Sequence, residues 1–454
     1  MKKERKKVIR YLSLCGLLGY GYAPESLENA LKEDLDFVGV DAGSTDPGPY
    51  YLGSGKNFVK KLQVKRDLSL ILPVIKEKKI PLIIGSSGGS GAAPHVQETL
   101  DIITEIAKEK SLSFRVAVIP SDLPEGFVKK AAKGHLFPCG GSPEFDPALA
   151  DKLANAVAQF GTDPIIEALK KDPEIIVSGR CCDTAVFASY PILMGFDPGL
   201  ALHAAKIAEC GALCARPVGA NDSLVVEMHE DFFTVQPPNP LRKCTPDSVA
   251  AHSLYEQPDP NCFYEPEGKI DLSACTFQQA GEGKVKVSGS RLVPAEKKTL
   301  KLEGAFLAGY RAITIAGLRD PSGIRHLKEI EEGVRASVAQ SANFVKEGEY
   351  SLRFLRYGLD AVTGKNEPEN PVLPREVGLV IEAVAPTQEK ADALVGLARS
   401  KALHQGFPDR KATAGNLAFP FSPSDFSGGA VYEFALYHLT DLSIPFKVKE
   451  VNIP

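Results

Sequence analysis

Short apolar runs alternate with amphipathic segments from Val8 to about Cys214, and this alternation most limits what the chain can fold into. In the segments between the runs, apolar residues recur three or four positions apart, as on one face of a helix. Near-continuous apolar strands separated by helices indicate a parallel sheet covered on both faces. The expected strands are VIRYLSLC, DFVGVDAG, IPLIIGSS, FRVAVIP and EIIVSGR.

The pattern changes beyond about Asn221, where alternating or β-branched segments are joined by Gly- and Pro-containing turns, as in antiparallel sheets. A helix at about 321–341 then precedes a strand at 377–384, a helix at 388–405 and strands at 416–421 and 432–439. This order suggests a small α+β module of ferredoxin-like kind.

We therefore expect an α/β chain with two domains. The large N-terminal domain, residues 1–340, would hold a wound, mostly parallel sheet in about 1–220 and an antiparallel β-rich region in about 221–340. The small C-terminal α+β domain, ferredoxin-like, would span residues 341–454.

Charge and composition exclude several classes of protein. A net charge of -4 and a pI near 6.1 argue against a nucleic-acid binder, which usually shows a basic stripe. No run approaches the roughly 18 apolar residues of a membrane span. The basic start followed by apolar residues is not read as a signal peptide, because Arg10 interrupts it. Nine scattered cysteines without a CxxC pair suggest reduced thiols in a cytoplasmic protein.

Polar residues follow the second expected strand in VGVDAGSTDPGPYYLGSG. Ligands in such sheets sit outside the carboxyl ends of the strands, so this loop is a candidate site. Its polar side chains could bind a divalent cation such as Mg²⁺ through two carboxylates, or act as acid and base. The alternative is an Asx-turn loop bonded to its own backbone. The candidates are Asp41, Ser44, Thr45 and Asp46, with Asp41 and Asp46 as the metal ligands if a metal binds.

A run of small residues, LIIGSSGGSGAAPHV, leads from the third strand into a helix. Free backbone N–H groups at a helix N-terminus favour an anion, such as a carboxylate or a CoA phosphate. The run is neither a P-loop nor a Rossmann fingerprint, and a merely tight turn is the alternative. We expect the anion contacts at Ser86, Ser87, Gly88 and Gly89.

The same letters, Gly85 to Gly89, also fit G-x-S-x-G in the strand-turn-helix context of a nucleophile elbow. Ser87 would then be a nucleophile, with Asp183 as acid and His203 or His252 as base. Glycine-rich segments produce this match by chance, and no HGGG-like oxyanion loop precedes it.

Three further segments carry candidate chemistry. In VSGRCCDTAVFA, Arg180 could grip a carboxylate and Asp183 could handle a proton, although an Asp at this place commonly only caps a helix. In LHAAKIAECGA, His203 is a candidate catalyst or simply a packed residue. In NPLRKCTPDSVAAHSLYE, Arg242 and His252 could lie across the site as part of a lid.

Together, VGVDAGSTDPGPYYLGSG, LIIGSSGG, VSGRCCDTAVFA, LHAAKIAECGA, RKCTPDSVAAHSLYE and FPFSPSD resemble the acyclic terpene utilisation (AtuA-like) family over nearly the whole chain. The resemblance implies a large N-terminal domain to about residue 340 and a fused C-terminal AtuA-like ferredoxin-fold domain. The family's name associates it with the breakdown of acyclic terpenes and related acyl-CoA or branched acids.

We expect a lyase or hydratase that acts on an organic acid or acyl-CoA in catabolism, without a redox cofactor and with either no cofactor or Mg²⁺. Its catalytic residues would be Asp41, Asp46, Asp183 and His203, and its substrate contacts Ser44, Thr45, Ser86, Ser87, Gly88, Gly89, Arg180, Arg242 and His252. One alternative is a serine hydrolase of a thioester, ester or lactone; another is a non-catalytic subunit of a catabolic complex. The expected partners are a small-molecule carboxylate or acyl-CoA and further copies of the chain, with neither nucleic acid nor membrane.

Overall fold

The computed structural model describes residues 6–219, 221–368, 372–411 and 413–454. Its backbone separates into two compact units, one made of Met1–Phe306 with Phe434–Pro454 and the other of Leu307–Glu433. Both units combine helices and strands, so the chain is a mixed α/β protein, as the sequence predicts. Within the described residues, none of the helices has the length and apolar character that crossing a membrane requires.

A ten-stranded sheet forms the centre of the first unit. Its middle strands β1, β2, β3, β7 and β4 are parallel, as their near-continuous apolar runs predict. Antiparallel strands extend it at both edges, so part of the β-rich region continues the same sheet. In spatial order the strands are β14 (Thr276–Gly281), β15 (Lys284–Ser288), β10 (Phe232–Gln236), β9 (Leu224–Met228), β1 (Ile9–Ser13), β2 (Phe37–Asp41), β3 (Leu82–Gly85), β7 (Ile175–Ser178), β4 (Phe114–Ile119) and β21 (Lys449–Ile453).

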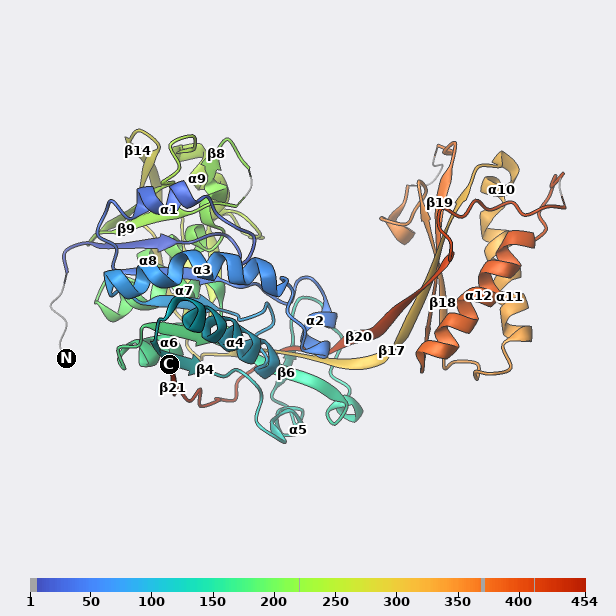
Figure 1. Cartoon of the computed structure of the whole chain (residues 1–454), viewed down its shortest axis with the longest axis horizontal. Coiled ribbons are helices and arrows are strands. Elements are labelled where there is room, and N and C mark those ends of the chain that lie inside the picture. The colour runs from blue at the N-terminus through green and yellow to red at the C-terminus, as the bar shows by residue number, and fades with distance from the viewer. Residues whose placement is uncertain (1–5, 220, 369–371, 412) are drawn as a thin grey trace. The chain divides into compact units, whose positions relative to one another are not determined.

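Helices cover both faces of this sheet, which gives it two apolar cores. Successive side chains of a strand point to opposite faces, so Phe37 belongs to one core and Val38 to the other. One face packs against α1 (Pro24–Ala30), α3 (Lys61–Lys78) and α4 (Ala93–Lys110), of which α3 and α4 lie side by side (Figure 1). The other packs against α6 (Thr162–Leu169), α7 (Asp183–Leu193) and α8 (Pro198–Ala208).

Shorter elements complete the first unit, and several of them border the cavity described below. The small sheets are β12–β13–β16 and the pair β8–β11, and β6 pairs with the first part of β17. Their bounds are α2 (Pro49–Ser54), α5 (Phe127–Ala131), β5 (Leu136–Pro138), β6 (Leu153–Gln159), β8 (Ala215–Arg216), β11 (Lys243–Cys244), α9 (Pro246–Ser253), β12 (Cys262–Glu265), β13 (Gly268–Asp271), β16 (Arg291–Pro294) and β17 (Leu300–Leu318).

The second unit has its own core, and four strands of a six-stranded sheet lie in it wholly or in part. Along the chain its elements are β17, α10 (Pro321–Arg325), α11 (Leu327–Ser341), β18 (Ser351–Tyr357), β19 (Val377–Ala385), α12 (Gln388–His404) and β20 (Asp425–Thr440). This is a βαββαβ order, with the strands arranged β18–β19–β17–β20. Apolar residues of α11 and α12 pack on β19. The assignment of 341–454 as a fused family domain stays a prediction.

Two details of the second unit differ from the sequence-based expectation. The strand expected at 416–421 is absent, and Ala418 forms only an isolated bridge with Gly317. The sequence reading also missed β18, whose residues pair along β19. Arg353 and Arg356 interrupt the apolar pattern of β18 and hide its strand periodicity.

Candidate functional site

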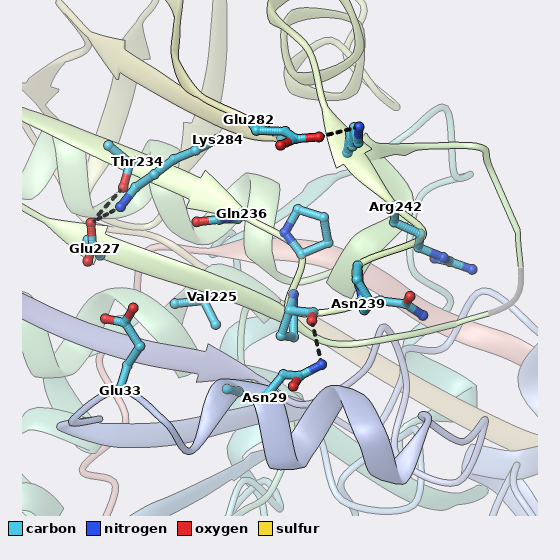
Figure 2. A pocket seen from close by; sticks show the side chains of 16 residues that line it. Asn29, Glu33, Val225, Glu227, Thr234, Gln236, Asn239, Arg242, Glu282 and Lys284 are labelled. Carbon is cyan, nitrogen blue, oxygen red and sulfur yellow. Dashed lines mark hydrogen bonds and ion pairs between the residues drawn. The ribbon is translucent and has the colours of Figure 1, made fainter.

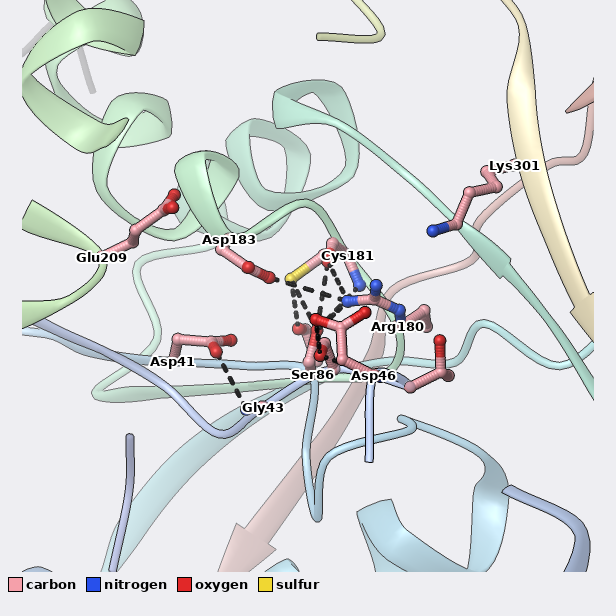
Figure 3. Close-up of polar contacts among 12 residues, drawn as sticks. Asp41, Gly43, Asp46, Ser86, Arg180, Cys181, Asp183, Glu209 and Lys301 are labelled. Atoms are coloured by element: carbon pink, nitrogen blue, oxygen red, sulfur yellow. Dashed lines mark hydrogen bonds and ion pairs between the residues drawn. The ribbon is translucent and has the colours of Figure 1, made fainter. Parts of the chain in front are cut away.

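The carboxyl ends of three neighbouring parallel strands bring the predicted residues together. Strands β2, β3 and β7 lie next to one another in the sheet. Asp41 is the last residue of β2, Ser86 follows β3 directly, and Arg180 follows β7 after one glycine. Figure 3 shows Asp41, Arg180 and Asp183 around one point, with Glu209 and Lys301 on either side of it in this view. This is the strand edge at which such sheets bind ligands.

Asp41 is buried, and its two carboxylate oxygens have different surroundings. Oδ2 accepts a hydrogen bond of 2.9 Å from the backbone N–H of Gly43. Oδ1 is buried, and no other described residue bonds to it. Burial raises the pKa of Asp41 well above its ordinary value, and the nearby charge of Asp183 raises it further. Asp41 is therefore a carboxyl group that tends to hold a proton.

Asp183 is the first residue of α7 and faces the same point. One of its oxygens, Oδ1, lies 3.6 Å from Nη1 of Arg180, while the side chain keeps 33% of its surface exposed. Burial raises the pKa of this carboxyl, and the positive charge of Arg180 only partly offsets the effect. Asp183 is thus partly open to ligands and has a pKa moved toward neutrality, as a general base requires.

Arg180 is largely engaged by other residues, and its expected role in gripping a carboxylate stays a prediction. Its side chain is 3% exposed. Nε donates a 2.9 Å hydrogen bond to Glu303, and Nη1 donates to Ser86 Oγ and to the Cys181 carbonyl, each at 3.1 Å. Although burial disfavours the charge, Glu303 and Asp183 raise the pKa of Arg180 above its ordinary value. Arg180 is therefore a fixed positive charge beside Asp183.

Glu303, near the start of β17, anchors this charge, and the sequence reading missed it. It is fully buried, and Oε1 accepts from Thr45 Oγ1 at 3.0 Å and pairs with Lys301 Nζ at 2.8 Å. Burial alone would raise the pKa of Glu303, but Arg180 and Lys301 lower it to about 2. The sequence feature that could have indicated Glu303 is its spacing from Lys301. The two charged residues are two positions apart, and thus on one face of a strand that is otherwise largely apolar.

A cavity of about 690 Å³ opens beside Asp183. On α8 and just beyond it, Lys206 and Glu209 form a 2.6 Å ion pair in its wall. Burial raises the pKa of Glu209 to about 8, against the effect of Lys206. Glu265, at the end of β12, also lines the cavity, and burial together with Glu267 and Glu209 raises its pKa to about 8. Lys269, Lys297 and Lys301 also line the cavity.

Asp46 and Ser44 lie in the same loop as Asp41 and are hydrogen-bonded to each other. Ser44 Oγ donates to Asp46 Oδ2 at 2.7 Å and accepts from the backbone N–H of Asp46. These bonds form a local turn, which is the alternative to a ligand-binding loop. The charge of Asp46 also contributes to the raised pKa of Asp183. No three His, Cys, Asp or Glu residues in the described part of the chain are grouped to hold a metal ion. A Mg²⁺ ion between Asp41 and Asp46 stays a prediction.

Several backbone amides of the Gly/Ser loop are already hydrogen-bonded within the protein. The N–H groups of Ser87, Gly89 and Gly91 donate to Ser178, Ser86 and Ser87 carbonyls, and those of Ala92 and Ala93 to the His95 and Asp122 side chains. An anion site at Ser86, Ser87, Gly88 and Gly89 therefore stays a prediction. What the geometry does show is close packing, since a Cβ at Gly91 (φ +66°) would lie 2.1 Å from the Arg180 backbone nitrogen.

The residues of the expected nucleophile elbow do not form a triad among the described contacts. Ser87 Oγ is buried, and no described residue bonds to it. His203 lies in the core, where its ring nitrogens pair with Ser290 Oγ at 3.2 Å and Ser253 Oγ at 3.0 Å. Burial lowers the pKa of His203 to about 3, so the ring is neutral. The contacts of His203 match the packed residue that was weighed as the alternative.

Arg242 lines a different pocket from Asp183, whereas His252 lies within reach of the charge of Lys206 in the cavity wall. Arg242 lines a polar pocket of about 560 Å³ near α1, together with Asn29 and Glu227 (Figure 2). In that pocket Glu227 accepts hydrogen bonds from Lys284 and Thr234. The His252 ring stacks on Tyr255, and burial, followed by the charge of Lys206, lowers the pKa of His252 to about 4.

The comparisons with known proteins agree with the resemblance seen in the sequence. The family model described as acyclic terpene utilisation family protein AtuA matches residues 54–416. Neither the curated proteins nor the solved structures gave a match.

Proposed function

Since this chain belongs to the acyclic terpene utilisation family, we propose that it is a lyase of the hydratase type acting on an organic acid or an acyl-CoA. Membership of the family suggests a role in terpene catabolism. The finer assignment rests on one observation: Asp183, a carboxyl group of raised pKa, opens into a cavity that also holds Glu265 and Lys301.

Addition or removal of water beside a carbonyl group needs a base and an acid at the same time. Asp183 is suited to be the base, because it is partly exposed and its pKa is raised. Glu265 is suited to be the acid, because a pKa near 8 keeps it protonated at neutral pH. Two carboxyl groups in one cavity can thus perform opposite proton transfers.

In the elimination direction, Asp183 takes the proton from the carbon next to the substrate carbonyl. The freed electron pair forms the carbon–carbon double bond, and the hydroxyl group on the next carbon leaves as water with the proton of Glu265. Lys206 and Lys301 face the cavity and can stabilise the negative charge that develops on the carbonyl oxygen. Hydration is the same sequence in reverse.

Asp41 supports the base without lining the cavity. It is buried beside Asp183, and burial together with the charge of Asp183 raises the pKa of Asp41. A protonated Asp41 leaves the negative charge on Asp183, where the substrate can reach it. The fixed charge of Arg180 keeps that carboxylate from being too basic.

The test is product identification by proton NMR. The purified chain is incubated with a panel of 3-hydroxy acids and 3-hydroxyacyl-CoA thioesters, with and without Mg²⁺. The proposal predicts an alkene signal and the loss of the carbinol proton, with no free thiol released. Release of free CoA or of an alcohol, together with loss of that activity in Ser87→Ala, would instead identify the serine hydrolase.

A further inference from the structure

The second compact unit contains a large groove of its own, with a volume of about 1390 Å³. Its walls come from α10, α11, β18 and residues 359–368, with Leu373. We propose that this groove binds a nucleotide carrying two or more phosphates. The groove shares no residue with the cavity beside Asp183, so this inference goes beyond the proposed function and does not depend on it.

The groove is strongly basic in a chain that is acidic overall. Two acidic side chains, Asp360 and Glu367, line it, and Asp360 is already bonded to Arg356, whose Nε donates at 2.8 Å. The net charge of the whole chain is -4. Such a local excess of positive charge attracts anions, and guanidinium groups suit phosphate oxygens. The basic lining residues are Arg325, Lys328, Arg335, Arg353, Arg356 and Lys365.

Three of these cations belong to α10 and α11. Lys328 and Arg335 are seven positions apart on α11, which places them on the same face of the helix. Arg325, at the end of α10, precedes them, and all three side chains are exposed. Three cations in a row can contact more than one phosphate group. A ligand with a single carboxylate would leave some of them unused.

A flat platform lies beside the cations. The guanidinium of Arg335 is stacked on the Phe354 ring, 4.8 Å from its centroid. Arg335 is itself exposed, so its outer face is open to a second planar group. Aromatic bases stack on guanidinium planes. Val362, 88% exposed, and the half-buried Leu359 add an apolar edge to the groove. The ligand that uses all of these features has a planar base as well as phosphates.

Glu331 allows a test in which a substitution should strengthen nucleotide binding. Its carboxyl lies 3.7 Å from the Arg356 guanidinium, and its Oε1 is buried without a hydrogen bond from any described residue. Burial raises the pKa of Glu331 to about 7, in spite of Arg356 and Arg335. When it is ionised, this carboxylate competes with a phosphate for Arg356. Its removal should therefore strengthen binding, whereas removal of a cation should weaken it.

The experiment is isothermal titration calorimetry of the full chain at low ionic strength with ADP, CoA, pyrophosphate and adenosine. ADP and CoA should bind, pyrophosphate should bind more weakly, and adenosine should bind least. The double variant Lys328→Gln/Arg335→Gln should weaken ADP binding about tenfold or more, since charge-assisted hydrogen bonds are lost. Glu331→Gln should strengthen it. Lys346→Gln, an exposed cation outside the groove, is the control and should leave it unchanged.

Equal affinities for ADP and CoA would show that the groove recognises the base and diphosphate that they share. A higher affinity for CoA would show that its third phosphate is also bound. Both outcomes support the proposal. Adenosine binding as tightly as ADP would overturn it, as would the absence of saturable binding at millimolar ADP. An ADP affinity that is the same in Lys328→Gln/Arg335→Gln and in Lys346→Gln would also overturn it. Circular dichroism checks that the double variant is folded, and the single change Arg325→Gln replaces it if it is not.

Discussion

Arg180 and Glu303 form a fully buried ion pair, in which Arg180 Nε donates to Glu303 Oε2 at 2.9 Å. The pair joins the end of β7 to the start of β17 and fixes a positive charge 3.6 Å from Asp183. Solvent does not screen the buried Arg180–Glu303 pair, so its interaction is strong. The pair therefore stabilises the site, and the charge of Arg180 influences the pKa of Asp183.

Glu303→Gln should destabilise the fold strongly. The substitution leaves the buried Arg180 without its strongest partner, and breaking a buried pair typically costs about 3–5 kcal/mol. Urea unfolding monitored by circular dichroism measures the change. Glu282→Gln removes an ion pair with Lys243 in which the glutamate is 82% exposed, and it should cost far less, because solvent screens such a pair. Equal costs for the two variants would contradict the account.

The stabilising effect of Glu303 should disappear in acid. Its folded-state pKa, about 2, lies below the unfolded value of about 4.3. Its stabilisation is therefore fully present above the unfolded pKa and is lost as the pH falls through the folded pKa. The difference in unfolding free energy between the wild type and Glu303→Gln should shrink between pH 7 and pH 3. A difference that stays constant over this range would show that Glu303 is not held ionised by its partners.

Glu265 should show the reverse dependence on pH. Its folded-state pKa is raised to about 8, so its contribution to stability is fully present below the unfolded value of about 4.3 and is lost as the pH rises through 8. Glutamine cannot ionise, so Glu265→Gln should gain stability relative to the wild type between pH 5 and pH 9. The two unfolding curves are compared at both pH values, and an unchanged difference would argue against a protonated Glu265.

Gly91→Ala should destabilise the first unit more than Gly126→Ala does. Both glycines have a positive φ, +66° and +73°, so both variants carry a similar backbone strain. Only at Gly91 would the new Cβ meet other atoms, 2.1 Å from the Arg180 backbone nitrogen, whereas nothing lies within 4 Å at Gly126. Overpacking typically adds about 1–3 kcal/mol. Thermal unfolding of the two variants measures the difference, and equal melting temperatures would refute close packing of the loop on Arg180.

The sequence allowed the parallel strands and the neighbouring polar residues at their carboxyl ends to be predicted, because both depend on local patterns. The apolar runs predicted strands β2, β3 and β7, which are neighbours in the sheet. Asp41, at the end of β2, and Asp183, which follows β7 in the sequence, lie close enough for the charge of one to shift the pKa of the other. Glu303 and Lys301 could not be predicted as their partners. They come from a distant strand, and only its pairing with β6 brings them to the site.

The roles of glycine and arginine were equally hidden from the sequence. A Gly-rich turn before a helix is compatible with an anion site or with tight packing, and the choice depends on which amides are already bonded. In the same way, Arg180 has the chemistry to hold a substrate carboxylate, but burial against Glu303 removes it from solvent. A single histidine such as His203 likewise shows its role only through its neighbours.

Deuterium incorporation from D₂O at the carbon next to the carbonyl, followed by proton NMR, tests the proposed role of Asp183 most directly. With a substrate identified in the screen, the wild type should exchange this proton. Asp183→Asn should lower the rate by about 100-fold or more, the usual contribution of a general base, while Ser87→Ala should stay within about tenfold of the wild type. Undiminished exchange in folded Asp183→Asn, or its abolition in Ser87→Ala, would contradict the account.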